Sequence, residues 1–437
     1  MVIYFIFLLA KILSLKYTYI RNNIKDPLAK IPLCIGKIND KPQCIKAVLD
    51  TTFFFIIIAE NNKENTVNFN KSKSIDKTDL IYYEYFIRPD YYFYRSNVYL
   101  DYFYFNDDFK YIESKQKNKF IISNLMEIEH DGIIGIGRKY TNNFINKKNP
   151  DNQESEIDSD ESYSFMKILS DNFINDKVIS FNPISPNQSI ILIGERENLG
   201  KYKKCYSIDN IENNKFYEDL WNCKLDYIKI IDNGKKFKFN NDKYAVFDSN
   251  SKNVILPYDI GIEIFNYIIN KVNVNCFIIK MEINTDYEYL ECNDKINLDI
   301  FPNILFSFKD LELVMRKNDF IRPSLVKGFY KINIIASKNI DYINIGLPIL
   351  KNYYIIFDYK DNSIGFPEDK GYLYGNPKSK NKNYYIILIL LLINNVILLI
   401  PLIIYVYLVR KKNINLLTMV LTYLFNKLIN VFNINFL

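Results

Sequence analysis

Short apolar runs separated by polar turns dominate the chain between its two ends. The runs are rich in Ile, Val, Tyr and Phe, and clusters of Asn, Asp and Lys interrupt them after a few residues. Runs of this length and composition are typical of β-strands. The clearest of them are 48–60, 190–194, 304–308 and 353–358. The pattern therefore predicts an all-β fold with few helices.

One segment has the periodicity of a helix instead. Within 257–271, Ile260, Ile264 and Ile268 recur every four residues, and Pro257 stands near the expected helix start. We predict a helix there. The acidic stretch 151–164 is expected to be a solvated loop.

A long apolar segment near the C-terminus is expected to cross a membrane. Residues 384–409 are apolar except for Asn394, Asn395 and Pro401, and about 20 such residues span a bilayer as a helix. The basic residues 410–412 that follow should stay in the cytoplasm. This predicts a single-pass, type I protein.

Both termini add to this topology. Residues 1–16 include a short apolar stretch and are expected to form a signal peptide or, alternatively, an uncleaved anchor. The tail 410–437 is basic and then apolar, and it either lies along the membrane or spans it again. The main part of the chain is thereby placed in the secretory pathway, or on the outer or lumenal side of a cell or organelle membrane.

Length and charge narrow the function classes. With 437 residues, 49% of them apolar, the chain can form one large domain or two ordinary ones. The net charge of +6 arises from 56 basic and 50 acidic residues spread along the chain. We expect no nucleic-acid partner, because no basic stretch is interleaved with aromatic residues.

The cysteines and the single histidine constrain the chemistry. An even number of cysteines in a lumenal segment suggests disulfides, and pairing of sequence neighbours is the simplest arrangement. The cysteines are Cys34, Cys44, Cys205, Cys223, Cys276 and Cys292. Their spacing matches no zinc pattern. The single histidine, His130, leaves neither a catalytic Cys/His pair nor a Ser/His/Asp triad with a spare partner. Neither a metal nor a cofactor is expected, so a peptide-cleaving enzyme of this composition would need carboxylate chemistry.

The chain contains a repeat. Residues 47–51 (AVLDT) recur as 245–249 (AVFDS), and each copy is followed by an apolar-apolar-Gly run, within 131–137 (DGIIGIG) and 342–348 (YINIGLP). The matched order of the two strings is hard to obtain by chance. Asp50 and Asp248 occupy equivalent positions in the two copies.

These residues resemble the pepsin-like aspartic proteases, and among them the plasmepsin type with a C-terminal membrane anchor. The resemblance covers residues 33–371. In that family each lobe carries an Asp-Thr/Ser-Gly loop through which an apolar-apolar-Gly strand passes. The further segments that carry the resemblance are 35–36, 42–43, Trp221 with Leu225 and Ile228, 344–350, 353–358 and 364–366.

The resemblance implies a bilobal pepsin-like fold, with an N-terminal lobe over 17–200 and a C-terminal lobe over 201–375. Asp50 and Asp248 would be the catalytic pair. Two carboxylates about 3 Å apart share one proton and activate a water against a peptide bond, which favours acidic pH. Thr51 and Ser249 would brace the two loops, with Ser251 as a supporting hydroxyl. We expect a monomer that acts on a peptide or protein substrate.

The loops depart from the family pattern at three positions. Thr52 and Asn250 stand where the family has Gly, and Phe53 replaces a hydroxyl residue. The substrate-covering flap is expected within 80–99, with Tyr85 as the flap candidate. The departures keep two alternatives open: a catalytically inactive relative that binds peptides or proteins, and a structural or adhesive membrane protein.

Overall fold

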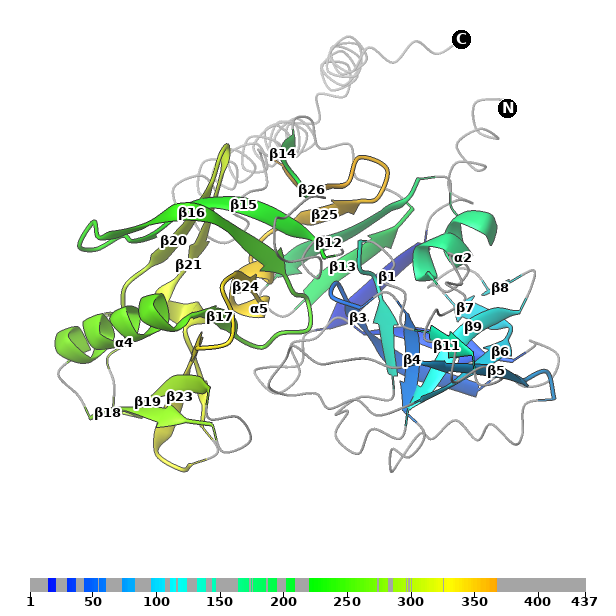
Figure 1. Ribbon diagram of the computed structural model, residues 1–437, viewed down its shortest axis with the longest axis horizontal. Coiled ribbons are helices and arrows are strands. Elements are labelled where there is room, and N and C mark those ends of the chain that lie inside the picture. Colours follow the sequence, from blue (N-terminus) through cyan, green and yellow to red (C-terminus); the bar gives the residue numbers. More distant parts are fainter. Residues whose placement is uncertain are drawn as a thin grey trace, which may run out of the picture. The chain divides into compact units, whose positions relative to one another are not determined.

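The computed structural model describes the chain in segments between residues 15 and 367. These segments are 15–20, 30–36, 43–53, 55–59, 73–82, 96–106, 111–114, 117–123, 132–138, 144–146, 164–172, 174, 176–185, 188–194, 202–208, 220–272, 275–281, 286–295, 297, 299, 301–324 and 326–367. They belong to one compact unit, Met1–Leu373; a second unit is Tyr374–Leu437. The described strands form three sheets, shown in Figure 1. The mostly β architecture confirms the predicted all-β character of the fold.

The first sheet is built from the first half of the chain. Its strand order is β11-β5-β6-β9-β4-β10-β3-β2-β7-β8. In chain order the strands are β2 (Lys30–Ile35), β3 (Gln43–Asp50), β4 (Ile56–Ala59), β5 (Asp76–Tyr82), β6 (Ser96–Asp101), β7 (Phe103–Asn106), β8 (Tyr111–Glu113), β9 (Asn118–Ser123), β10 (Gly132–Gly135) and β11 (Phe144–Asn146). The apolar run 48–60 is therefore two strands, because a turn at Thr51 and Thr52 separates β3 from β4.

The second sheet comes from the second half. Its order is β18-β19-β23-β17-β24-β16-β15-β20-β21, and β22 pairs with β23. The strands are β15 (Asn222–Ile230), β16 (Lys236–Phe247), β17 (Val254–Pro257), β18 (Cys276–Lys280), β19 (Tyr287–Asn293), β20 (Ile304–Phe308), β21 (Leu311–Met315), β22 (Ile321–Pro323), β23 (Phe329–Ser337) and β24 (Ile343–Ile345). The predicted strand 304–308 has the same bounds as β20.

The third sheet combines strands from both halves. Its order is β1-β13-β12-β25-β26-β14, and Figure 1 shows β12 between β13 and β25. The strands are β1 (Leu15–Ile20), β12 (Val178–Ser185), β13 (Gln188–Ile193), β14 (Tyr202–Tyr206), β25 (Ile355–Asp358) and β26 (Ser363–Pro367). The lobe boundaries at 17–200 and 201–375 stay predictions.

The described helices are short except for one. They are α2 (Phe165–Asn172), α4 (Tyr258–Val272), α5 (Leu347–Leu350) and the 3₁₀-helix η6 (Lys317–Asp319). The predicted helix 257–271 is confirmed as α4, which has Asp259 in its first turn and Lys271 in its last, the charges that the helix dipole favours. A Cβ on Gly261 would lie 2.6 Å from Ala336 Cβ, so this glycine lets α4 approach β23 closely.

The repeat has the same strand arrangement in both halves. In the first, β10 runs parallel to β3 and antiparallel to β4, so it lies between the two arms of the loop that follows Asp50. In the second, β24 lies in the same way between β16 and β17. Ile133 pairs with Val48, and Asn344 pairs with Val246. The apolar-apolar-Gly runs are therefore the strands that pass between the arms.

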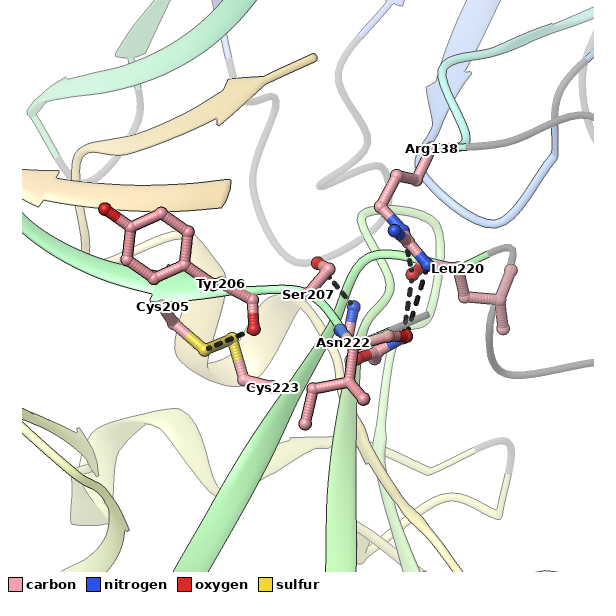
Figure 2. The surroundings of a disulfide bond; sticks show 8 residues. Arg138, Cys205, Tyr206, Ser207, Leu220, Asn222 and Cys223 are labelled. Carbon is pink, nitrogen blue, oxygen red and sulfur yellow. Dashed lines mark hydrogen bonds between the residues drawn. A yellow bond between two sulfur atoms is a disulfide. The ribbon is translucent and has the colours of Figure 1, made fainter. Parts of the chain in front are cut away.

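A hydrogen-bonded junction connects the two halves next to the Asp50 loop, at Ile136, whose N–H donates to the carbonyl of Asp50. The carbonyl of Ile136 accepts from Trp221 Nε1 at 2.9 Å and from the Tyr359 hydroxyl at 2.6 Å. The buried Arg138 donates from Nε to the carbonyl of Leu220 at 3.1 Å and from Nη2 to the carbonyl of Ile208. Figure 2 shows the Arg138 guanidinium directed at Leu220 beside the Cys205–Cys223 bridge. The first and second halves of the chain are thus joined by these side-chain hydrogen bonds as well as by the third sheet.

All six cysteines form disulfides. The bonds are Cys34–Cys44, Cys205–Cys223 and Cys276–Cys292, which confirms the pairing of sequence neighbours. The first and third join directly opposed residues of adjacent antiparallel strands. Disulfides of this kind are typical of secreted or extracellular domains.

Several predictions fall on residues that the structure does not describe. They concern the N-terminal segment up to residue 14, Tyr85 with most of the expected flap, most of the acidic stretch, the segment 384–409 and the tail. In the part of the chain that the structure describes, no helix has both the length and the apolar character needed to cross a membrane.

Candidate active site

The two aspartate loops are held together by reciprocal hydrogen bonds between Thr51 and Ser249. Thr51 N–H donates to Ser249 Oγ at 3.1 Å, and Ser249 N–H donates to Thr51 Oγ1 at 2.9 Å. Each hydroxyl also donates to the opposite strand: Thr51 Oγ1 to the carbonyl of Phe247 at 2.6 Å, and Ser249 Oγ to the carbonyl of Leu49 at 2.8 Å. All four bonds are buried and bind loops about 200 residues apart in the chain, so Asp50 and Asp248 are brought to the same seam.

Asp50 is fully buried and receives hydrogen bonds on both carboxylate oxygens. The backbone N–H of Thr52 donates to Oδ1 at 2.8 Å, and the Thr52 hydroxyl donates to the same oxygen at 2.7 Å. The side-chain amide of Asn250 donates to Oδ2 at 2.8 Å. Thr52 therefore supplies the hydroxyl that Phe53, which is buried, does not.

Asp248 is also fully buried, and donors reach both of its oxygens. The backbone N–H groups of Asn250 and Ser251 each donate to Oδ1 at 3.0 Å. The side-chain amide of Asn344 donates to Oδ2 at 2.9 Å. The hydroxyl of Ser251, expected to support the carboxylate, donates instead to the carbonyl of Asn253 at 2.8 Å.

Asn250 touches both aspartates. One residue thus hydrogen-bonds to both carboxyl groups, through its backbone N–H to Asp248 and through its side-chain amide to Asp50.

Sequence reasoning missed the roles of Asn250 and Asn344 as amide donors. The departure at Asn250 is visible in the sequence, but the direction of its side chain is not. A signal for Asn344 is present in the repeat, because an asparagine stands where the first copy has Ile133.

Gly346 is needed for the second loop to close. A Cβ on this residue would lie 2.0 Å from the carbonyl oxygen of Asn253 and 2.7 Å from that of Ser251. Real side chains essentially never approach so closely, so the turn that donates to Asp248 packs directly on the glycine backbone.

Residues 93–369 match the model of the eukaryotic aspartyl protease family. This range is more than half of the chain, and it includes Asp248, both strands that pass between loop arms, and the closing strands β25 and β26. The chain belongs to the eukaryotic aspartyl protease family. The matched range begins after Asp50, so the placement of Asp50 rests on the repeat and on its contacts in the structure. No curated protein matches the chain.

A cavity of about 690 Å³ lies apart from the aspartates. Its lining comes from β14, the β20–β21 hairpin, the turn that follows α5, and β26. The lining residues include Lys203, Lys309, Glu312 and Tyr353. Neither Asp50 nor Asp248 lines it, and its mixture of both charge signs favours no particular ligand.

Proposed function

We propose that this chain is an aspartic-type endopeptidase in which Asp50 and Asp248 activate a water against a peptide bond of a peptide or protein substrate. The observation that carries the proposal is the reciprocal bracing of Thr51 and Ser249, with a buried aspartate on each side of it. An aspartate that only stabilises its own turn would not need a second buried aspartate, from the other half of the chain, on the far side of the Thr51–Ser249 bonds.

The mechanism follows from two carboxyl groups at one seam. One shared proton makes one member of the pair an acid and leaves the other as a base. The base withdraws a proton from the attacking water, and the acid polarises the substrate carbonyl. The backbone N–H groups of Thr52, Asn250 and Ser251 orient the carboxyl planes during these transfers.

A catalytically inactive, peptide-binding relative is the second candidate. The amide of Asn250, which crosses from one loop to the carboxylate of the other, favours this reading, because it occupies an oxygen of Asp50 that a reacting water would otherwise contact. The two candidates differ in turnover but agree on the fold.

The test is hydrolysis of a library of quenched fluorescent peptides by the purified full-length protein between about pH 3 and 7. Asp50→Asn and Asp248→Asn should each lower kcat by at least about a hundredfold while leaving the fold intact. Asp358→Asn is the matched control, since Asp358 is equally buried but caps a turn at the backbone N–H groups of Lys360 and Asp361. Binding of a peptide without turnover in the unmodified protein would favour the second candidate.

We also propose that residues 384–409 anchor the protein in a membrane of the secretory pathway, with the protease-like part on the lumenal or extracellular side as a monomer. The disulfides and the apolar composition of this segment support the proposal. Retention of the full chain in membranes after alkaline carbonate extraction, and its release when residues 376–437 are deleted, is the expected result. Extraction of the full chain would contradict it.

A further inference from the structure

The Cys205–Cys223 disulfide differs from the other two in what it joins. Each of the others links directly opposed residues of one antiparallel pair of strands. Cys205 lies in β14, at the edge of the third sheet, whereas Cys223 lies in β15 of the second sheet. In the described sheets, β14 pairs with β26, and β15 pairs with β16 and β20. This disulfide therefore ties together two strands that belong to different sheets.

Hydrogen bonds next to the disulfide continue the link. The buried Asn222 accepts from the N–H of Ile208 at its Oδ1, at 2.9 Å, and donates from Nδ2 to the Ile208 carbonyl at 3.3 Å. Its backbone N–H donates to Ser207 Oγ at 3.3 Å, and Figure 2 shows both residues beside the disulfide. The two segments that carry the cysteines are thus held side by side by a covalent bond and by these hydrogen bonds.

Trp221, two positions before the second cysteine, contacts the backbone next to both aspartates. Its carbonyl accepts from the N–H of Phe247 at 2.9 Å, and its Nε1 donates to the carbonyl of Ile136 at 2.9 Å. Phe247 immediately precedes Asp248. The N–H of Ile136 donates to the carbonyl of Asp50 at 2.8 Å. A displacement of Trp221 would therefore move the backbone on both sides of the aspartate pair.

Arg138 makes the same connection from the Asp50 side. It donates from Nε to the carbonyl of Leu220 at 3.1 Å and from Nη2 to the carbonyl of Ile208 at 3.3 Å. These two carbonyls belong to the two segments that the disulfide joins. The donors of a guanidinium have a fixed geometry, so one arginine reaches both carbonyls only if the segments keep their spacing. The disulfide sets that spacing.

We propose that the Cys205–Cys223 disulfide is a positioning element of the active site, which fixes Trp221 and Arg138 and, through them, the relative placement of the two aspartate loops. The proposal rests on the function proposed above. A misplacement of reacting groups by about 1 Å can lower a rate about a hundredfold. Loss of the disulfide should therefore lower kcat more than it raises KM.

The experiment compares peptide hydrolysis by the full-length protein and by the double variant Cys205→Ala/Cys223→Ala. The double variant should lose at least about tenfold in kcat. The matched control is Cys276→Ala/Cys292→Ala, because the two disulfides join residues 18 and 16 positions apart and so constrain the unfolded chain almost equally. The control should keep a kcat close to that of the unmodified protein. Equal losses in the two double variants would overturn the proposal, since they would reflect stability alone.

Trp221→Phe tests the same connection with the disulfide intact. Phenylalanine keeps an aromatic ring in the core but lacks the N–H that donates to the Ile136 carbonyl. This variant should also lose kcat more than it gains in KM, and it decides the question if Cys205→Ala/Cys223→Ala does not fold. An unchanged kcat in Trp221→Phe would overturn the proposal.

A second readout needs no turnover and separates this proposal from the proposed function. Trp221 is the one tryptophan of the chain, and its side chain is fully buried. In Cys205→Ala/Cys223→Ala its emission should shift to longer wavelength and acrylamide should quench it more strongly, with neither change in the control. If no protein hydrolyses peptides but this difference appears, the protease function fails and the positioning of Trp221 stands. If the fluorescence is the same in all three proteins, the inference fails whatever the activity.

Discussion

Replacement of Gly346 by alanine should disrupt the loop that follows Asp248 and lower the stability of the protein. The added Cβ would lie 2.0 Å from the carbonyl oxygen of Asn253 and 2.7 Å from that of Ser251, both of them backbone atoms. The turn cannot withdraw freely, because Leu347 N–H donates to the Ser251 carbonyl at 2.9 Å and Ser251 Oγ donates to the Asn253 carbonyl. Relief of the overlap must therefore break or stretch these bonds.

The expected cost combines two contributions. Overpacking a well-packed site costs about 1–3 kcal/mol, and each hydrogen bond lost adds about 1 kcal/mol. Gly346→Ala should then lower the free energy of unfolding by about 3–5 kcal/mol. Since the same turn supplies two backbone donors to Asp248, activity should fall even where the protein remains folded.

Equilibrium unfolding in urea, followed by the fluorescence of Trp221, measures this cost. Trp221 is the only tryptophan in the chain and is fully buried. Gly365→Ala is the matched control, because the nearest atom to its added Cβ, Ile356 Cβ, lies at an ordinary 3.5 Å. Equal unfolding midpoints for the two variants would refute the close-packing argument.

Two further predictions concern the bonds between the halves. Thr51→Val removes two buried hydrogen bonds and should cost about 2–4 kcal/mol in urea unfolding. Ser249→Ala added to it should cost less than the sum of the single changes, because both residues act in one network; full additivity would argue against reciprocal bracing. Burial raises the pKa of Tyr359 well above its ordinary value of 10.0, so the stability it contributes is complete below pH 10 and is lost as the pH rises further. Tyr359→Phe should therefore lose less stability than the unmodified protein when the pH of urea unfolding is raised above 10, and equal losses would contradict this.

Sequence patterns predicted the features that arise over short distances or by repetition. The helix 257–271 follows from apolar residues four apart, and the strand 304–308 from a short run in which only Ser307 is polar. The neighbouring cysteines pair because adjacent antiparallel strands bring two of the three pairs directly opposite each other. The two aspartate loops were found because the same short strings occur in the same order in each half.

The composition of the site was decided by tertiary structure. Asn250 donates to a carboxylate 200 residues away, and Asn344 to one 96 residues away, which no local pattern encodes. Phe53 stands where the family pattern has a hydroxyl residue, yet the Thr52 hydroxyl and the Asn250 amide supply donors to Asp50. A sequence specifies which residues stand at a turn, but only the packed loops determine the directions in which their side chains extend.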